Sequence, residues 1–363
     1  MRRGLLRLSV LLGVLTLGVQ KIASAEDTTR QYQLARGEGG TRLELVEVPM
    51  PVAGPNEVLV RVRASSLNRR DTMMVAGQYP GGGSGGIPLS DGAGEVIAVG
   101  EGVTRFGIGD RVAGIFFAGW VDGERDAAKL ASARGGGATG MLSEVVVSHE
   151  DGLVRIPDHL SFEQAATLPC AGVTAYVVLF KHGGLEAGEY VLLEGTGGVS
   201  SFGLVFSVAA GARPIITSSS DEKLARAREL GAFGTVNYVT NENWQREVRA
   251  LTGDHGVDHV LEVGGRDTLQ KAIEALAYDA HIGLIGGLSG FAPSIPVGTL
   301  MQLGTEVTGI YVGSREDFEA MNAFIEEHEI VPVVDRVFEF EDAPAAFDFM
   351  ENGSFFGKIV IRH

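Results

Sequence analysis

Tyr190-Val-Leu-Leu-Glu-Gly195-Thr-Gly197-Gly198-Val-Ser200-Ser-Phe-Gly203 is the stretch that decides the fold of this 363-residue chain. Its mostly apolar start, Tyr190 to Leu193, predicts a buried parallel strand. After the glycines, a small apolar helix is expected over Val199 to Ala210, ending at Gly211. The first N–H groups of such a helix are unpaired, and with the positive end of the helix dipole they favour a pyrophosphate.

Glycine makes up 52 of the 363 residues, so a G-x-G pattern is weak evidence by itself. The setting strengthens it, because the apolar run Arg213 to Thr217 follows the helix and completes a βαβ unit. The alternative is a turn that needs glycine only for packing. Ser200 stands where a third glycine usually allows close helix–strand packing. We expect the dinucleotide to lie on Gly195, Thr196, Gly197, Gly198 and Val199.

The composition is that of an ordinary globular protein, with 45% hydrophobic and 21% charged residues. The chain is long enough for two domains. A net charge of −16 argues against binding to nucleic acid or to anionic membranes, because both would repel this surface. The one cysteine, Cys170, excludes an intramolecular disulfide and a zinc site built from several thiolates.

Residues 1–25 are expected to be a cleavable export signal. Arg2, Arg3 and Arg7 form a positive head, a modest apolar run follows, and Ala23-Ser24-Ala25 offers a cleavage site. The apolar run is too short to span a bilayer, so we expect no stable membrane insertion after processing. The paired arginines resemble a twin-arginine signal, which exports folded proteins, and an ordinary secretory signal is the alternative. Either signal predicts an exported, periplasmic protein.

Residues 26–160 show short strands between Gly/Pro turns, which predicts a small β-barrel-like domain. A short helix is expected over residues 68–76. Two stretches are rich in glycine. The first, residues 79–87, is either an active-site lid or a surface linker, and the second, residues 122–140, is interpreted as a linker.

From residue 161 the pattern changes to strands that alternate with helices, which predicts a doubly wound parallel sheet over residues 161–313. Residues 314–363 are expected to return to the first domain with two helices and two strands. The strands expected in the parallel sheet are 191–193, 214–217, 235–238, 257–263, 281–285 and 306–311.

The end of the second strand of a dinucleotide site usually distinguishes NAD from NADP, because an acidic residue there repels the 2′-phosphate. Here Ser218 and Ser219 stand at that place, and Lys223 follows on the next helix with Arg226. Hydroxyls and cations bind a phosphate dianion through charge-assisted hydrogen bonds. Asp221 competes with this interpretation but is expected to be the helix N-cap. We therefore expect NADP(H).

Several separate stretches resemble the medium-chain dehydrogenase/reductase superfamily, from about Tyr32 to the C-terminus. The resemblance implies an α/β protein in which a Rossmann domain is inserted into a GroES-like, β-rich catalytic domain, with the site in the cleft between them. It also implies a homodimer built on the Rossmann sheets. Besides the Gly195 turn, the stretches are Ala64-Ser-Ser-Leu-Asn68-Arg-Arg-Asp71, Asp91-Gly-Ala-Gly94-Glu-Val, Gly109-Asp110-Arg111-Val112, Ala165-Ala-Thr-Leu-Pro-Cys170-Ala-Gly-Val-Thr-Ala-Tyr176 and Phe356-Gly357-Lys358.

The chain departs from the family's alcohol dehydrogenases at the catalytic zinc. The resemblance places two of the three ligand positions at Arg70 and Ser90, and the third at Cys170. A catalytic zinc needs three protein ligands, which these residues do not supply. The lobe that holds the family's structural zinc is replaced by residues 122–140. No metal is therefore expected, and the chain looks like the zinc-independent quinone oxidoreductases and 2-enoyl reductases.

Related reductases place an Asn and a Tyr beside the nicotinamide, and these match Asn68 and Tyr79, with Asp71 nearby. Asn68 is equally interpreted as a helix cap, and Tyr79 as an anchor of the glycine-rich loop. Cys170 is expected to pack as a small apolar residue. The resemblance also places five residues along the cofactor groove, where each is equally interpreted as ordinary strand-end or surface structure: Tyr238, Gly264, Gly286, Val312 and Lys358.

The sequence thus predicts an NADP(H)-dependent enzyme that transfers hydride to a quinone or an α,β-unsaturated carbonyl. Such acceptors need no metal, because the charge arrives on an oxygen that a hydrogen-bond donor stabilises. Two alternatives remain: zinc-dependent oxidation of a small alcohol, and an NADP-binding protein without turnover. The expected partners are a small quinone or enone and a second copy of the chain.

Overall fold

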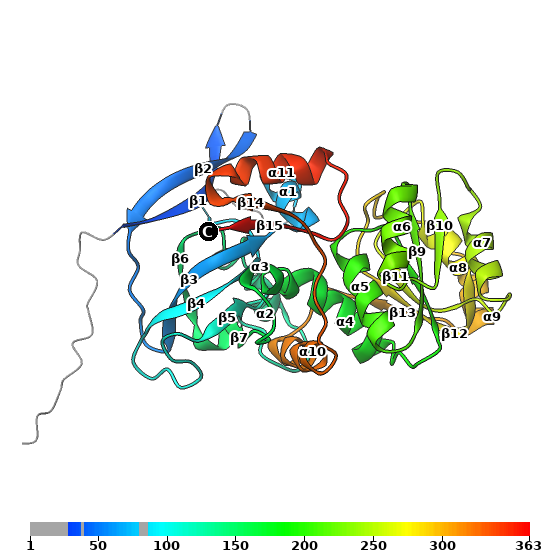
Figure 1. Cartoon of the computed structure of the whole chain (residues 1–363), viewed down its shortest axis with the longest axis horizontal. Helices are drawn as coiled ribbons and strands as arrows, with labels where there is room; N and C mark the ends of the chain where they lie inside the picture. Colours follow the sequence, from blue (N-terminus) through cyan, green and yellow to red (C-terminus); the bar gives the residue numbers. More distant parts are fainter. Residues whose placement is uncertain (1–27, 38–39, 80–85) are drawn as a thin grey trace, which may run out of the picture.

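The computed structural model describes residues 28–37, 40–79 and 86–363. The export signal expected over residues 1–25 and most of the glycine-rich loop at 79–87 lie outside the described residues. Figure 1 shows a β-rich lobe and a second lobe in which helices flank a parallel sheet. The expected fold class, a Rossmann domain inserted into a GroES-like catalytic domain, is confirmed.

The second lobe is built on six parallel strands in the order β10-β9-β8-β11-β12-β13. This is the strand order of a Rossmann sheet. Successive strands are added on one side of the central strand and then on the other, and in such sheets a crevice forms at the carboxyl ends of the strands where this order reverses. The central strand is the one that precedes the glycine turn. The strands are β8 (Tyr190–Leu193), β9 (Arg213–Ser218), β10 (Gly234–Asn237), β11 (Val257–Glu262), β12 (Leu276–Leu284) and β13 (Glu306–Gly309).

The helices of this lobe follow the prediction except at two places. The sequence pattern predicts a helix over residues 267–277, but the helix in the structure ends at Glu274, because Leu276 and Ala277 are buried and already belong to β12. A helix after Pro296 was not predicted. Its end at Gly304, which has a left-handed φ of +70°, is the signal that marks it. The helices are α5 (Gly198–Ala209), α6 (Asp221–Glu229), α7 (Trp244–Leu251), α8 (Leu269–Glu274) and α9 (Val297–Leu303).

The β-rich lobe contains a seven-stranded sheet in which the C-terminal strand lies between β14 and β3. The end of the chain therefore completes this sheet. A ribbon of β1 (Thr28–Gly37) and β2 (Gly40–Pro49) lies beside it. The sheet strands are β3 (Glu57–Ser66), β4 (Asp91–Val99), β5 (Arg111–Gly114), β6 (Val145–His149), β7 (Leu153–Arg155), β14 (Val334–Glu339) and β15 (Lys358–Arg362).

A continuous helical segment over residues 168–182 joins the two lobes, with α4 (Val173–Tyr176) at its middle and wider turns on either side. It packs on α5 and on α10. One hydrophobic cluster runs from Ile115 in the β-rich lobe to Leu193 in the Rossmann sheet, so the two lobes share a core. The remaining helices are α1 (Arg69–Val75), α2 (Ala127–Ala131), α3 (Phe162–Ala165), α10 (Arg315–Glu327) and α11 (Ala343–Asn352).

Residues 122–140 are not the linker that their glycines suggest. The segment forms α2 and then buries Arg134 almost completely. The Arg134 guanidinium donates to the carbonyls of Ile115 and Gly152 and to the hydroxyl of Ser148, and burial lowers its pKa to about 10. The prediction was wrong because the glycine content did not reveal how many acceptors surround this one arginine.

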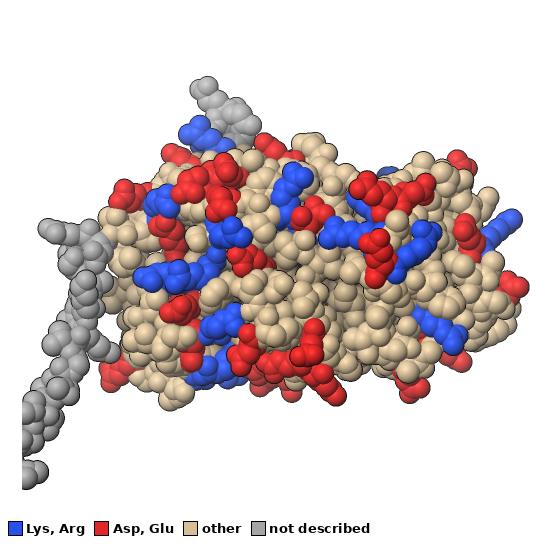
Figure 2. All heavy atoms as spheres, viewed as in Figure 1, with Lys and Arg blue, Asp and Glu red and all other residues tan. Residues whose placement is uncertain are grey.

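On the face shown in Figure 2, Lys and Arg side chains are interspersed with Asp and Glu and do not gather into one basic patch. Among the described residues, no helix has both the length and the apolar character that crossing a bilayer requires.

Candidate active site

The glycine turn follows β8 and opens α5 as predicted. Gly195 has a φ of +71°, a left-handed backbone that favours glycine, and Gly197 caps the helix. A Cβ built on Gly195 or Gly197 would meet no atom within 4 Å. The space next to these two glycines is therefore open, and the first N–H groups of a helix are donors that suit an anion. That this anion is the pyrophosphate of a dinucleotide stays a prediction.

The glycine that brings helix and strand together is Gly203, not the position of Ser200. A Cβ on Gly203 would lie 2.6 Å from Leu193 Cδ2 and 2.8 Å from Leu261 Cδ2. The Ser200 hydroxyl instead donates to the Glu194 carbonyl at 2.7 Å. The close packing of α5 on the sheet thus depends on Gly203, the last residue of the stretch that opens the sequence analysis. This role was not predicted from the sequence.

The buried carboxyl groups of Glu194 and Glu262 lie at the carboxyl ends of β8 and β11, next to the glycine turn. Burial raises the pKa of Glu194 well above its ordinary value, and the nearby Glu262 carboxylate raises it further. Glu262 accepts from the N–H groups of Gly264 and Gly265 at 2.8 and 2.7 Å. This pair fixes the strand end where Gly264 stands, and only the structure brings the two side chains together.

Ser218 and Ser219 stand at the end of β9, beside the glycine turn. Ser218 is buried and Ser219 is exposed. The α6 N-cap is Ser220, whose hydroxyl accepts from the Lys223 N–H, so the prediction that Asp221 caps this helix was wrong. Asp221 accepts instead from the Asn237 amide at 2.8 Å.

Lys223 and Arg226, both on α6, differ in their contacts with acidic side chains. The Arg226 guanidinium pairs with Asp335 at 3.1 Å and lies over the Phe356 ring. Lys223 Nζ lies 6.0 Å from the centre of the Phe355 ring, and burial lowers its pKa. Of the two cations, Lys223 is the one without a direct carboxylate contact among the described ion pairs, so it is the better placed to receive a phosphate.

The other predicted groove residues lie at the same edge of the sheet, because the strands are parallel. Tyr238 follows β10 and is partly exposed, Gly264 follows β11, and Gly286 follows β12. Val312 follows β13 with a φ of +57°, a strained conformation for a β-branched residue. Such strain clusters at functional sites. The structure therefore collects these residues beside the turn, while their contact with a cofactor stays a prediction.

On the catalytic side, Asn68 is the buried N-cap residue of α1. Its backbone N–H donates to Asp71 Oδ2 at 2.7 Å, and its carboxamide oxygen accepts from Lys358 Nζ at 2.6 Å. The residue is thus both a cap and part of a polar cluster. Lys358 was expected either near the cofactor phosphates or on the surface. Its side chain is buried, so the surface interpretation was wrong, and its ammonium donates to Asn68. Its contact with a cofactor stays a prediction.

Asp71 is fully buried, and burial raises its pKa to about 6 although the guanidinium of Arg70 opposes this. Arg70 Nη1 lies 3.6 Å from Asp71 Oδ1 and donates to the Arg134 carbonyl at 2.9 Å. The Arg70 guanidinium also lies over the rings of Tyr79 and Phe116, at 5.0 and 4.8 Å from their centres. Asp71 therefore accepts from the backbone at the start of α1 and pairs with the Arg70 guanidinium.

The residues at the expected zinc position do not fit a zinc ion. Asn68, not Arg70, lies beside Ser90, with its Nδ2 at 3.5 Å from the Ser90 hydroxyl. Ser90 donates to Asp91, and the Asp91 carboxylate lies 3.5 Å from the Lys358 ammonium. A cation next to these groups opposes a second one, and an amide and a hydroxyl are poor zinc ligands.

Cys170 lies in the first wide turn of the segment 168–182, and its N–H faces Asp91 at 3.4 Å. Burial raises the pKa of its thiol, which disfavours a thiolate. Among the described residues, no three His, Cys, Asp or Glu side chains are grouped so that they could hold a metal ion.

Tyr79 meets a residue that sequence reasoning missed. Its hydroxyl lies 2.8 Å from that of Tyr311, which follows β13 in the Rossmann lobe. The pKa of Tyr311 is raised, mainly by burial and then by the hydrogen bond to Tyr79. In the sequence, the position of Tyr311 next to the predicted groove residue Val312 could have marked it as a site residue. Only the fold, however, brings the two phenols together.

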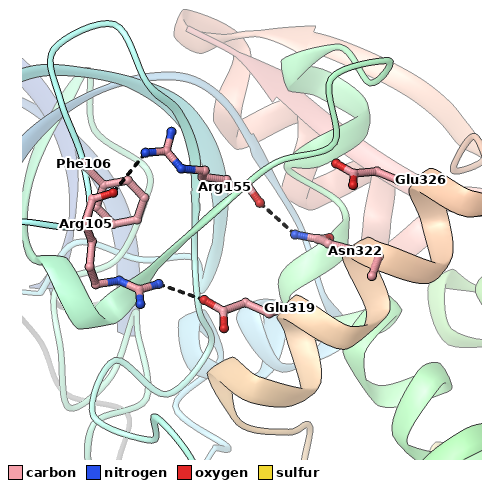
Figure 3. Close-up of a pocket in the computed structure, with 7 residues that line it drawn as sticks. Arg105, Phe106, Arg155, Glu319, Asn322 and Glu326 are labelled. Atoms are coloured by element: carbon pink, nitrogen blue, oxygen red, sulfur yellow. Dashed lines mark hydrogen bonds and ion pairs between the residues drawn. The ribbon is translucent and has the colours of Figure 1, made fainter.

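A separate surface hollow of about 500 Å³ lies between α10 and the β-rich lobe (Figure 3). Both of its arginines are paired, Arg105 with Glu319 at 2.8 Å and Arg155 with Asp110 at 2.7 Å, and the Asn322 amide donates to the Arg155 carbonyl at 2.8 Å. It contains none of the predicted site residues, which lie at the glycine turn and around α1 instead.

Comparisons with known proteins agree with this geometry. Residues 54–158 match the model of the alcohol dehydrogenase GroES-like domain, and residues 198–327 match that of the zinc-binding dehydrogenases. A zinc-type alcohol dehydrogenase-like protein of Schizosaccharomyces pombe is 41% identical over 88% of this chain and 94% of its own length. The chain belongs to the medium-chain dehydrogenase/reductase superfamily. It is therefore an oxidoreductase of a family that uses nicotinamide cofactors.

Other members carry different names. A quinone oxidoreductase of Pseudomonas aeruginosa is 34% identical over 80% of this chain and 85% of its own. A solved structure from Sinorhizobium meliloti 1021, titled as an alcohol dehydrogenase, has a TM-score of 0.88 at 40% identity and covers 94% of this chain and 100% of its own. Solved relatives include an NAD-dependent alcohol dehydrogenase at 32% identity and an NADP complex of a 2-octenoyl-CoA carboxylase reductase at 25%.

Proposed function

We propose that this medium-chain oxidoreductase uses NADPH to reduce a quinone or an α,β-unsaturated carbonyl without a metal. The observation that carries the proposal is the polar cluster at the expected metal position. There the Lys358 ammonium engages Asn68 and Asp91, and a carboxamide stands in place of a Lewis acid. A carboxamide is a hydrogen-bond donor, which suits acceptors whose charge arrives on an oxygen.

The bound cofactor supplies the hydride, and the chain supplies orientation and a proton. Asn68 Nδ2 donates a hydrogen bond to the developing enolate or quinol oxygen. Tyr79 provides the proton that completes the reduction, and Tyr311 holds the Tyr79 hydroxyl at 2.8 Å. The Arg70 guanidinium lies over the Tyr79 ring, 5.0 Å from its centre, and helps to hold that ring in place.

The preference for NADPH rests on the end of β9. Ser218 and Ser219 stand where NAD-binding relatives of this fold carry an acidic residue, and Lys223 is a nearby cation. Asp221, the competing carboxylate, is engaged by Asn237. Hydroxyls and an ammonium suit the 2′-phosphate of NADP.

Rapid mixing of the purified chain with NADPH and a panel of quinones, enones and simple alcohols tests the proposal, with metal content measured on the same sample. We expect NADPH oxidation by a quinone or an enone that survives a chelator. Alcohol oxidation that depends on added zinc would instead establish the alcohol dehydrogenase activity named for several relatives. NADPH binding without turnover by any acceptor would make the chain a binding protein.

We propose in addition that two copies pair through the edge strand β13. This strand ends the sheet and leaves backbone groups unpaired on one side. Large apolar side chains are exposed on it and on the neighbouring α9, including Val307, Val297 and Met301. An apolar patch beside a free edge suits a second copy. A monomer by light scattering, or a dimer unchanged by Val307→Lys, would contradict this.

For the segment over residues 1–25 we propose export to the periplasm with cleavage near Ala25. N-terminal sequencing of the protein from a periplasmic fraction is expected to begin at Glu26. Repeating the fractionation in cells without the twin-arginine translocase distinguishes the two export routes. An uncleaved N-terminus in the cytoplasmic fraction would contradict the proposal.

A further inference from the structure

Lys358 is the first residue of β15, and its side chain is 2% exposed. Its ammonium donates to the Leu67 carbonyl at 2.7 Å and to Asn68 Oδ1 at 2.6 Å, and it lies 3.5 Å from Asp91 Oδ2. An ammonium has three N–H donors and no acceptor. All three donors thus have an acceptor within the catalytic lobe, and the buried charge lies next to a carboxylate.

This contact decides how the Asn68 carboxamide is oriented. An amide oxygen and an amide nitrogen have nearly the same shape, so only hydrogen bonding fixes which one faces a neighbour. A group that only donates requires the oxygen, so Oδ1 faces Lys358 and Nδ2 is turned away. The only hydrogen bond from Nδ2 among the described residues is a long one, 3.5 Å to Ser90. Asn68 therefore retains donor capacity.

Lys358 also touches the glycine turn. A Cβ on Gly198, the first residue of α5, would lie 2.8 Å from Lys358 Cδ, so the lysine stem packs against the helix start. The preceding Gly357 donates its N–H to the Thr196 carbonyl at 2.9 Å. The strand that carries Lys358 is thus hydrogen-bonded to the turn, and the same side chain reaches from α5 to Asn68.

We propose that Lys358 is a positioning residue: it holds the Asn68 carboxamide with its oxygen inward so that Nδ2 faces the substrate, in register with the glycine turn. The inference rests on the proposed function of Asn68 as a hydrogen-bond donor. It differs from the expectation that Lys358 binds the cofactor, because a lysine that bound a phosphate would act on NADPH affinity, whereas a positioning lysine acts on the rate at saturating NADPH.

The test compares Lys358→Met, Asn68→Asp and the double variant with wild type. NADPH affinity is measured by fluorescence, and kcat and KM by NADPH oxidation with the best acceptor. Asn68→Asp keeps an oxygen for Lys358 but removes the N–H donor, so we expect a folded protein with kcat lowered by about 100-fold. Lys358→Met is expected to lower kcat by about tenfold or more, with the NADPH dissociation constant changed less than about threefold. The matched control is Lys271→Met on the surface of α8.

The double variant is expected to be no slower than Asn68→Asp, because both changes remove one donor function. Multiplicative losses in the double variant would overturn the proposal. So would a Lys358→Met enzyme with wild-type kcat and NADPH affinity weakened tenfold, which is the result expected for a phosphate ligand. If Lys358→Met does not fold, Lys358→Arg replaces it, with a smaller loss of kcat at unchanged NADPH affinity expected.

A readout independent of turnover separates this inference from the proposed function. In protein labelled with ¹⁵N-asparagine, the side-chain amide signal that Asn68→Asp removes belongs to Asn68. We expect that signal to be shifted or broadened in Lys358→Met and unchanged in Lys271→Met. An unchanged signal overturns the positioning role. If the signal shifts in Lys358→Met but the wild-type protein reduces no acceptor, the positioning role is retained and the proposed function is rejected.

Discussion

The hydroxyl oxygens of Tyr79 and Tyr311 lie 2.8 Å apart, although 232 positions separate the two residues in the sequence. Tyr79 follows α1 in the catalytic lobe, whereas Tyr311 follows β13 in the Rossmann lobe. The pair therefore joins the two lobes at the edge where the glycine turn opens. Hydride addition to an enone or quinone also consumes a proton, and a phenol that is hydrogen-bonded to a second phenol is a suitable source.

Removing these hydroxyls should slow the reaction by different amounts. Tyr79→Phe is expected to lower kcat by about 100-fold, because it removes the group that gives up the proton. Tyr311→Phe is expected to lower kcat by about tenfold, because Tyr79 then lacks its partner. Steady-state kinetics at saturating NADPH, with the solvent isotope effect, measures both.

Tyr278→Phe is the matched control, because Tyr278 is 69% exposed near the amino end of β12, whereas Tyr311 follows the carboxyl end of the parallel strand β13. The double variant Tyr79→Phe/Tyr311→Phe should match Tyr79→Phe alone if the two hydroxyls act in series. Full activity of Tyr79→Phe would remove Tyr79 from the mechanism while leaving the hydride-transfer proposal intact.

The choice of cofactor should change with the charge at the end of β9. Ser219→Asp places a carboxylate near the 2′-phosphate, and Lys223→Ala removes a cation. Each is expected to lower kcat/KM for NADPH relative to NADH by about tenfold, which corresponds to about 1.4 kcal/mol. Lys271→Ala serves as the surface control. A wild-type enzyme that prefers NADH would contradict the NADPH assignment before any variant is made.

Acid should destabilise the protein through His281. This imidazole is buried between His259 and Glu306 on the neighbouring strands, near His182, and burial followed by the charge of His259 lowers its pKa to about 4 from an ordinary 6.5. Between these values the unfolded chain binds the proton and the folded chain does not. The stability contributed by the neutral ring is therefore present above pH 6.5 and is lost as the pH falls toward 4.

His281→Phe replaces the imidazole with an apolar ring. Urea denaturation at pH 7.5 and pH 5 should show a loss of stability with acid that is smaller than that of wild type by about 1–2 kcal/mol. His255→Phe, at an exposed position that pairs with Asp258, is the control. An equal acid sensitivity in wild type and His281→Phe would show that other groups govern this range.

Close packing at Gly203 should make α5 intolerant of even one methyl group. Gly203→Ala would bring a Cβ to 2.6 Å from Leu193 Cδ2, and both Leu193 and Leu261 are fully buried. We expect a loss of about 1–3 kcal/mol in unfolding free energy, with weaker NADPH binding as the helix start shifts. Gly298→Ala, on α9 in open space, should be neutral or stabilising. Equal stability of the two variants would contradict this close approach.

Much of the fold was predictable because its signals are local. The strand, glycine turn and helix over 190–210 follow from hydrophobic periodicity and from the backbone freedom of Gly195, and the structure reproduces them within a residue or two. The errors also have a local origin. The linker predicted over residues 122–140 was inferred from glycines alone, whereas the buried Arg134 organises that segment through acceptors outside it, on Ser148 and Gly152.

The candidate site was predictable by residue type but not by contact. Asn68, Asp71 and Tyr79 were selected from the sequence, yet the partners that give them their geometry were not: Lys358 for Asn68, Arg70 for Tyr79, and Tyr311 across the lobes. The pairing of Glu194 with Glu262 was likewise invisible. Except for Arg70 and Tyr79, which are close in the sequence, these contacts join residues tens to hundreds of positions apart, and no local pattern encodes them.

The sequence by itself determined the glycine turn, the alternation of strands and helices, and the lack of enough thiols for a cysteine-based metal site, because each depends on residue type and short-range spacing. Only the tertiary structure decided that Lys358 faces Asn68 instead of solvent, and that Gly203 is the residue against which the sheet packs. Both depend on β15 returning beside β3 and on α5 crossing β8 and β11, which are long-range packing events that bury charge and exclude a single methyl group.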